Sequence, residues 1–89
     1  MFPHPKTGIT LYTKSKCSYC VKAKQNFPKA NIINCDNYLS VKRNDFLAFI
    51  DTLTNKKPRT FPMVFRDKEY LGGHDDTKHL GVFNLKEYF

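Results

Sequence analysis

The alternation of hydrophobic and polar residues predicts a strand and then a helix near the start of the chain. Over residues 8–13, Ile9 and Leu11 fall on one face of an extended segment, and the residues between them face the other way. Residues 18–27 follow a helical pattern, which Pro28 should end or kink. This part of the chain therefore predicts a strand followed by a helix, which are the first two elements of a βαβ unit.

A second strand and a longer helix are predicted in the middle of the chain. Residues 31–35 form a short strand. Ser40 is a suitable N-cap for a helix that runs to about Leu53, and residues 55–58 should end it. The apolar positions of this helix repeat at helical intervals and are Phe46, Phe49, Ile50 and Leu53.

The last third of the chain differs in kind, because it predicts a hairpin. Two short apolar runs, residues 63–65 and 69–71, are separated by three charged residues. Gly72 and Gly73 should end the second of these strands. A final helix is then expected, with Asp75 or Asp76 as its N-cap, an end near Phe89, and Gly81 inside it at a cost of roughly 1 kcal/mol relative to alanine.

The predicted order of elements is therefore β-α-β-α-β-β-α, which is an α/β fold. A βαβ unit has a right-handed crossover and contributes two parallel strands. The hairpin adds two antiparallel strands, so we expect a four-stranded mixed sheet flanked by helices. We expect residues 1–89 to form a single domain, because no repeat or low-complexity linker divides them.

Composition narrows the functional class. A net charge of +7 implies attraction to an anionic partner: nucleic acid, an acidic protein or a small anionic substrate. No apolar run is long enough to span a membrane, and the N-terminus does not read as a signal peptide. The three cysteines, with one close pair, are not a secreted disulfide framework. We therefore expect a cytoplasmic protein in a reducing compartment.

The most informative motif is Cys17-Ser18-Tyr19-Cys20, which follows the first strand and opens the first helix. Two cysteines at this spacing lie one helical turn apart, close enough to form and break a disulfide. Cys17 would lie where unpaired N–H groups and the helix dipole favour an anion, so we expect its pKa to fall to ~3.5–7.5. A structural zinc site needs four ligands, and no second Cys-x-x-Cys or Cys-x-x-His is present. The pair therefore predicts redox chemistry rather than a metal site.

Three motifs together resemble the glutaredoxin family over nearly the whole chain. They are Tyr12 to Cys20, Arg59-Thr60-Phe61-Pro62, and Gly72-Gly73-His74-Asp75-Asp76, in the order and at the intervals usual for that family. The resemblance implies a thioredoxin-like fold with glutathione as reducing co-substrate and no tightly bound cofactor. It also implies that Cys17 is the exposed nucleophile and Cys20 the resolving thiol.

The resemblance further implies where glutathione binds. Pro62 is expected to be cis, so that the backbone of Phe61, where the family usually has Val, pairs with the cysteinyl part of glutathione. Lys14 and Arg59 match positions that hold the glycine carboxylate. The N–H groups of His74 and Asp75 would hold the γ-glutamyl carboxylate, with Asp75 preferred to Asp76 for the ammonium. The implied glutathione-binding residues are Lys14, Tyr19, Arg59, Thr60, Phe61, Pro62, Gly73, His74, Asp75 and Asp76.

Several other residues have simpler interpretations. Tyr12 and Tyr19 are expected to line the glutathione groove. The alternative for either residue is an ordinary half-buried aromatic, and for Tyr12 the two interpretations have equal weight. Cys35 is expected to be a small buried residue, and the imidazole of His74 is expected to matter less than its backbone. Five basic residues are expected to form solvated faces, with docking of an acidic protein as the lesser alternative: Lys22, Lys24, Lys29, Lys42 and Arg43.

The sequence thus predicts a monomeric dithiol glutaredoxin that reduces protein disulfides and protein–glutathione mixed disulfides. Ribonucleotide reductase, a dehydroascorbate-like small molecule and glutathionylated proteins are all compatible substrates within the family. Two alternatives stay open: a thioredoxin-reductase-dependent electron donor, and a 2Fe–2S carrier using Cys17 of two chains with two glutathiones, which the small residue Ser18 would permit. A nucleic-acid-binding module is not favoured, because no recognised motif accompanies the positive charge.

Overall fold

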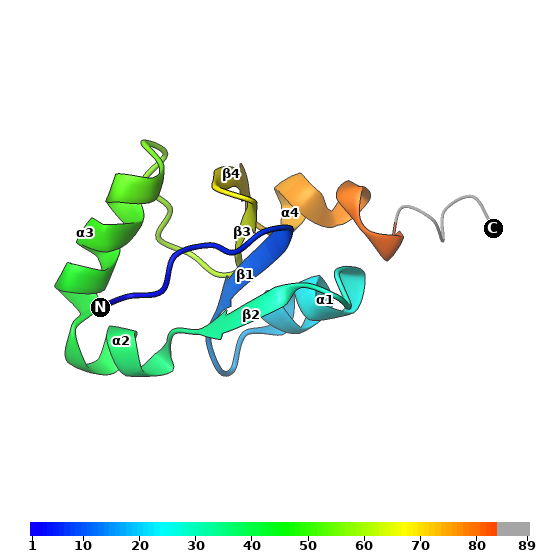
Figure 1. Ribbon diagram of the computed structural model, residues 1–89. Coiled ribbons are helices and arrows are strands. Elements are labelled where there is room, and N and C mark those ends of the chain that lie inside the picture. Colours follow the sequence, from blue (N-terminus) through cyan, green and yellow to red (C-terminus); the bar gives the residue numbers. More distant parts are fainter. Residues whose placement is uncertain (84–89) are drawn as a thin grey trace.

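A four-stranded mixed sheet lies at the centre of the protein (Figure 1). In this computed structural model, which describes residues 1–83, β1 pairs with β2 in parallel and with β3 antiparallel, and β3 pairs antiparallel with β4. The strand order is therefore β2-β1-β3-β4, and both the βαβ unit and the hairpin are confirmed. The strands are β1 (Ile9–Thr13), β2 (Asn31–Asn34), β3 (Met63–Arg66) and β4 (Glu69–Gly72).

Helices cover both faces of this sheet. The helices are α1 (Ser18–Asn26), α2 (Asp36–Val41), α3 (Arg43–Leu53) and α4 (His74–Thr77), followed by a 3₁₀ turn at Lys78–Leu80. Figure 1 shows α2 and α3 on one side of the sheet and α1 and α4 on the other. Within residues 1–83, no helix has the length and apolar character needed to cross a membrane.

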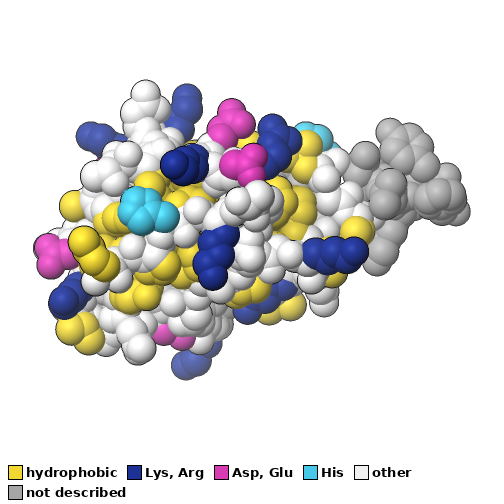
Figure 2. Space-filling model, in the orientation of Figure 1, with side chains coloured by type: hydrophobic (Ala, Val, Ile, Leu, Met, Phe, Trp, Pro, Cys, Tyr) yellow, Lys and Arg dark blue, Asp and Glu magenta, His cyan; other side chains and the backbone are white. Residues whose placement is uncertain are grey.

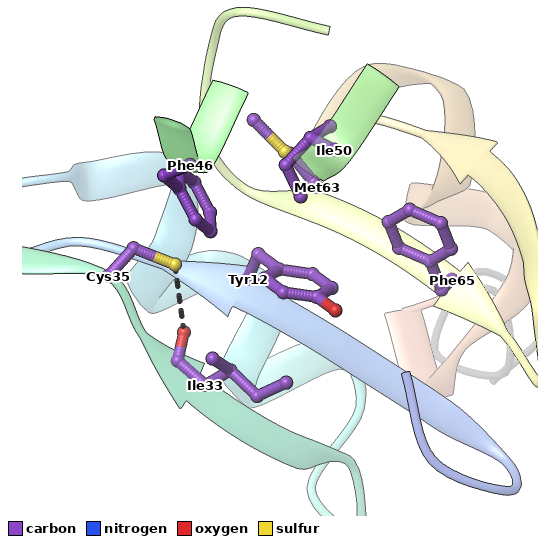
Figure 3. Close-up of a cluster of buried hydrophobic side chains, with 7 residues drawn as sticks. All are labelled: Tyr12, Ile33, Cys35, Phe46, Ile50, Met63 and Phe65. Atoms are coloured by element: carbon purple, nitrogen blue, oxygen red, sulfur yellow. Dashed lines mark hydrogen bonds between the residues drawn. The ribbon is translucent and has the colours of Figure 1, made fainter. Parts of the chain in front are cut away.

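Successive side chains of a strand point to opposite faces of the sheet, so the buried hydrophobic side chains form one cluster on each face. Leu11 and its partner Val64 point toward α1, where they pack with Ala23 and Phe27. The larger cluster faces α3 and is drawn in Figure 3: Tyr12, Ile33, Cys35, Phe46, Ile50, Met63 and Phe65. The helical repeat predicted from the sequence supplies Phe46 and Ile50 to this cluster, and both side chains are fully buried. The prediction that Cys35 is buried is also confirmed.

The N-terminal segment closes the larger cluster from outside. The ring of Phe2 lies 5.2–5.5 Å, centroid to centroid, from those of Tyr38, Phe46 and Phe49. The hydroxyl of Tyr12 donates a hydrogen bond of 2.8 Å to the carbonyl of Pro3. Tyr12 is completely buried, and burial raises the pKa of its hydroxyl. The prediction that Tyr12 lines the functional groove is therefore wrong; this side chain ties the N-terminal segment to the core.

The helix predicted from Ser40 to Leu53 is in fact two helices. The Asn34 amide oxygen accepts a hydrogen bond of 3.0 Å from the backbone N–H of Asp36, and this local turn starts α2 before Ser40. Lys42, with φ −134° and ψ 45°, then interrupts the helical backbone, so that α3 begins at Arg43. Ser40 therefore lies inside α2 and is not an N-cap.

The last predicted helix starts earlier than expected. Gly73, rather than Asp75 or Asp76, is the N-cap of α4, because the Asp76 carboxylate accepts a hydrogen bond from the Gly73 N–H. Gly81 lies beyond α4 in extended backbone, where an added Cβ would overlap the carbonyl and the amide of Asn26. Its role is therefore close packing on α1, not an interior helical position. The predicted end near Phe89 lies outside the described residues.

We predict that Tyr12→Phe lowers the free energy of unfolding by about 1 kcal/mol, because the Pro3 carbonyl loses its buried donor while the ring remains. Urea unfolding followed by far-UV circular dichroism measures this difference. Tyr19→Phe is the matched control, since the Tyr19 side chain is 51% exposed. An equal loss in both variants would contradict the role assigned to the Tyr12 hydroxyl.

Candidate active site

Cys17 and Cys20 form a disulfide at the start of α1, with their Cα atoms 5.2 Å apart. Cys17 is the N-cap of the helix and is partly exposed, whereas Cys20 is 1% exposed. The sulfur of Cys17 accepts a hydrogen bond of 3.2 Å from the N–H of Cys20. In the reduced protein, the same N–H and the helix dipole favour a thiolate at Cys17. The pair thus combines an accessible nucleophile with a sheltered second thiol.

The backbone before β3 lies directly beside the nucleophile. The sulfur of Cys17 is 3.5 Å from the carbonyl oxygen of Phe61. The Phe61–Pro62 peptide bond is cis, as the family resemblance implied. Two segments separated by 44 residues therefore meet at the reactive sulfur.

A groove of about 410 Å³ runs from Phe61 to the start of α4. It brings together every residue predicted to bind glutathione except Lys14 and Arg59, and it adds Tyr70, which the sequence analysis missed. Its volume lies within the range of ~300–1,000 Å³ usual for small-molecule sites. The lining residues are Tyr19, Thr60, Phe61, Pro62, Tyr70, Gly73, His74, Asp75 and Asp76.

One wall of the groove is an aromatic stack between α1 and α4. The rings of Tyr19 and His74 lie 5.3 Å apart and nearly parallel, at 22°. Lys22, one turn after Tyr19, places its Nζ 5.4 Å from the centre of the Tyr19 ring. His74 thus contributes its imidazole to the wall, whereas the sequence analysis expected only its backbone to matter.

The acidic end of the groove depends on a glycine. Gly72 has φ +128°, and an added Cβ would overlap the side chain of Asp76. The Asp76 carboxylate, which accepts a hydrogen bond of 3.1 Å from the Gly73 N–H, also helps burial to raise the pKa of Tyr70. Asp75 is exposed and lies beside it in the groove lining. The groove therefore ends in two carboxylates next to a half-buried phenol.

The two predicted cations lie in different surroundings. Lys14 is exposed, and its Nζ lies 5.8 Å from the centre of the Phe61 ring, at the other end of the groove from the carboxylates. Arg59 instead binds Asp51 of α3 with two hydrogen bonds, of 2.9 and 2.8 Å, and a third bond reaches the carbonyl of Pro58. This bidentate pair holds the loop that leads to Pro62 against α3, and it lowers the pKa of Asp51.

The loop before Cys17 is fixed by Asp36, the first residue of α2. The Asp36 carboxylate accepts hydrogen bonds from both the N–H and the hydroxyl of Ser15, the former at 2.8 Å. Lys16, between Ser15 and Cys17, has φ +55° in the left-handed region, which costs energy for a residue with a side chain. The bonds to Ser15 and the nearby Lys14 charge lower the pKa of Asp36. Asp36 therefore holds the loop in the form that presents Cys17.

A second cavity and the third cysteine, Cys35, lie outside this groove. A larger cavity, of about 610 Å³, lies at the opposite end of β1 between Phe27, Leu80 and Val82 and contains no cysteine. Among residues 1–83, no three His, Cys, Asp or Glu side chains gather as a metal ion would require. Burial raises the pKa of Cys35 to about 12, and the Asp36 carboxylate adds to that rise.

A redox-active cysteine pair at the N-terminus of a helix, beside a cis-proline loop, defines a thiol–disulfide oxidoreductase site. The family model for glutaredoxin matches residues 9–71. Glutaredoxin 1 of Rickettsia typhi is 34% identical over 84 residues, which cover 89% of this chain and 70% of the relative. Human mitochondrial glutaredoxin-2 is 31% identical over 78 residues, which cover 81% of this chain and 44% of the relative. The chain therefore belongs to the glutaredoxin family.

Solved structures agree with this assignment. Glutaredoxin 1 from Francisella tularensis, crystallised with cacodylate, superposes with a TM-score of 0.64 at 26% identity, covering 91% of this chain and 94% of that one. Oxidised glutaredoxin 2 from Chlamydomonas reinhardtii gives a TM-score of 0.63 at 27% identity, with 89% and 79% covered. The thioredoxin-like fold implied by the sequence is thus confirmed.

Sequence reasoning did not identify three residues that shape the site: Asp36, Asp51 and Tyr70. Asp36 acts through Ser15, 21 residues earlier in the chain, Asp51 acts through Arg59, and Tyr70 lines the groove directly. For Tyr70 a signal existed, because its strand leads directly into the Gly72-Gly73 motif. For the two aspartates, only the three-dimensional structure reveals the partner.

The lowered pKa of Asp36 predicts a pH dependence of stability. The ionised carboxylate stabilises the folded state above the unfolded-state pKa of about 3.9, and this contribution disappears as the pH falls through the lower folded-state pKa. The stability difference between wild type and Asp36→Asn should therefore be constant near neutral pH and shrink below about pH 4. Urea unfolding from pH 7 to pH 3 measures it. Asp45→Asn, which changes an exposed carboxylate in the first turn of α3, is the control. A difference between wild type and Asp36→Asn that persists at pH 3 would contradict the prediction.

Proposed function

We propose that this protein is a glutathione-dependent thiol–disulfide oxidoreductase that reduces protein–glutathione mixed disulfides and protein disulfides. One observation carries the proposal: the groove beside Cys17 is built from all three motifs, although they are far apart in the sequence. A general disulfide donor needs the cysteine pair but has no need for a groove with charged ends. This groove is therefore an argument against the thioredoxin-reductase-dependent alternative.

The arrangement of charges supports glutathione as the ligand. Glutathione carries two carboxylates and one ammonium group, so a matching site needs cations at one end and anions at the other. Lys14 lies near Phe61 at one end, and Asp75 and Asp76 lie at the other. The cysteinyl part would then lie between them, beside the Phe61 backbone and the sulfur of Cys17.

The first chemical step is a thiol–disulfide exchange. The Cys17 thiolate attacks the glutathione sulfur of a mixed disulfide, and the S–S bond to the substrate protein breaks. The protein thiolate leaves with the electron pair of that bond and takes a proton from water. Cys17 is then joined to glutathione, whose peptide part occupies the groove.

Two routes regenerate the enzyme. In one route, a second glutathione thiolate attacks the bound glutathione sulfur, and oxidised glutathione leaves. In the other route, Cys20 attacks the sulfur of Cys17, releases reduced glutathione and forms the Cys17–Cys20 disulfide, which two further glutathiones reduce. The Cα separation of 5.2 Å permits this disulfide without backbone movement. Glutaredoxins have reduction potentials of about −200 to −230 mV, so glutathione can drive this last step.

Substitution of each cysteine should separate these routes. Cys17→Ser should abolish turnover of a small glutathione mixed disulfide, because the serine hydroxyl is not ionised at neutral pH. Cys20→Ser should retain this activity and lose the reduction of intramolecular protein disulfides, which needs both thiols. Glutathione oxidation coupled to glutathione reductase and NADPH measures both activities. Turnover by Cys17→Ser, or a wild type inactive with glutathione, would refute the proposal.

The Arg59–Asp51 pair leads to a second prediction about glutathione. If Arg59 positions the loop before Pro62, then Arg59→Gln and Asp51→Asn should raise the KM for glutathione equally, by roughly two- to fivefold, and the double variant should be no worse. Lys14→Gln should raise the KM by a similar factor, independently of both. Steady-state kinetics at varied glutathione concentration measures these values.

Direct binding of glutathione by Arg59 would change the KM values of the two variants in a different way. If Arg59 instead bound a carboxylate of glutathione, Asp51→Asn would free its guanidinium and lower the KM, while Arg59→Gln would raise it. Arg66→Gln is the matched control, because Arg66 forms an exposed ion pair of 3.7 Å with Glu69 in the hairpin. This control should leave the KM unchanged.

A further inference from the structure

The positive charge of the chain does not by itself select a ligand. On the face drawn in Figure 2, basic side chains are spread over the surface with acidic ones among them, and they do not gather into one patch. A charge that is distributed in this way attracts anions of every kind. Selectivity among thiol peptides therefore depends on short-range contacts inside the groove, where a few polar groups fix the position of a ligand.

Tyr70 is anchored at the acidic end of this groove. It belongs to β4, and its ring lies 5.3 Å, centroid to centroid, from that of Phe65 in the larger core cluster. The residue is half-buried and lines the groove together with Asp75 and Asp76. Because the ring already packs on the core, it loses little further freedom when a ligand binds, and this favours precise recognition.

The hydroxyl of Tyr70 has no hydrogen-bond partner in the part of the chain that the structure describes. The hydroxyl of Tyr12, by contrast, is bonded to the carbonyl of Pro3. Burial and the nearby Asp76 carboxylate raise the pKa of Tyr70, so its phenol keeps the proton at the mildly alkaline pH where thiols ionise. The end of the groove thus presents a hydrogen-bond donor beside two carboxylates.

This arrangement matches the head group of an α-amino acid, in which one carbon carries both an ammonium and a carboxylate. Asp75 and Asp76 attract the ammonium, but they repel the carboxylate next to it. The Tyr70 hydroxyl supplies the donor that this carboxylate needs. In glutathione the glutamate is joined through its side chain, so its head group stays free. In an ordinary peptide the same carboxylate is consumed by the peptide bond.

We propose that Tyr70 is a specificity-determining residue, whose hydroxyl donates a hydrogen bond to the α-carboxylate of the γ-glutamyl group and so selects thiols with a free amino acid head group. The inference rests on the proposed function, because it requires that glutathione lies in the groove with this group toward Asp75 and Asp76. It adds a residue that lies outside all three sequence motifs.

The test uses two tripeptides that contain the same atoms and differ only in one linkage: γ-glutamyl-cysteinyl-glycine, which is glutathione, and its α-glutamyl isomer. Each is supplied as a mixed disulfide with a small neutral aromatic thiol that absorbs light once it is released. The Cys17 thiolate attacks the tripeptide sulfur, and the aromatic thiolate leaves with the electron pair of the broken S–S bond. Stopped-flow absorbance with reduced protein gives the second-order rate constant for each tripeptide.

We expect wild type to react at least roughly tenfold faster with the γ-linked tripeptide. Tyr70→Phe keeps the ring and removes the donor, so the ratio of the two rates should fall roughly fivefold, as expected for the loss of one hydrogen bond. A purely structural effect of this substitution would lower both rates together and leave the ratio unchanged.

Tyr38→Phe is the matched control. The Tyr38 ring is half-buried against the same core cluster, but it lies on α2, outside the groove. This variant should keep the wild-type ratio.

Three results would overturn the proposal: equal rates for the two tripeptides in wild type, a ratio that Tyr70→Phe does not change, or an equal fall of the ratio in Tyr70→Phe and Tyr38→Phe. Failure of the proposed function is a separate result. In that case wild type would not reduce a small mixed disulfide with glutathione as the reductant, whereas failure of the present proposal alone leaves that turnover intact.

Discussion

The antiparallel pairing of β1 with β3 is the interaction on which the active site depends. Its register places Tyr12 opposite Met63, so the end of β1 meets the start of β3. The chain that leaves β1 toward Cys17 and the chain that enters β3 through Pro62 are therefore forced together. The contact between the Cys17 sulfur and the Phe61 carbonyl follows from this register, and a shift by one residue would also turn Tyr12 out of the core.

Polar contacts then fix the two loops beside Cys17, whose conformations the pairing of the strands does not determine. Asp36 holds the loop on one side of Cys17, and the Asp51–Arg59 pair holds the loop on the other side. Both aspartates belong to the helices that cover the opposite face of the sheet from α1. The helices behind the larger core cluster thus do more than bury apolar surface, because they also position both walls around the reactive sulfur.

The sequence predicted most of the fold, because local patterns and the fold agree over β1, α1 and the hairpin. The errors fall where a helix begins at a different residue from the one expected. Ser40 and Asp75 are good N-caps by residue type, but the N-cap of α2 is Cys35, which follows Asn34, and the N-cap of α4 is Gly73. In the site, the family motifs indicated the groove residues. They could not indicate that Arg59 binds Asp51, since that bond depends on how α3 packs beside the loop.

The depth of each thiol has a practical consequence for labelling chemistry. Cys17 is partly exposed, whereas Cys20 and Cys35 are at most 1% exposed. An alkylating reagent added to the native, reduced protein therefore modifies Cys17 alone. Cys35 lies in the cluster between the sheet and α3, so its modification requires that this cluster open. The chain thus carries its own reporter of core opening, independent of the chemistry at its active site.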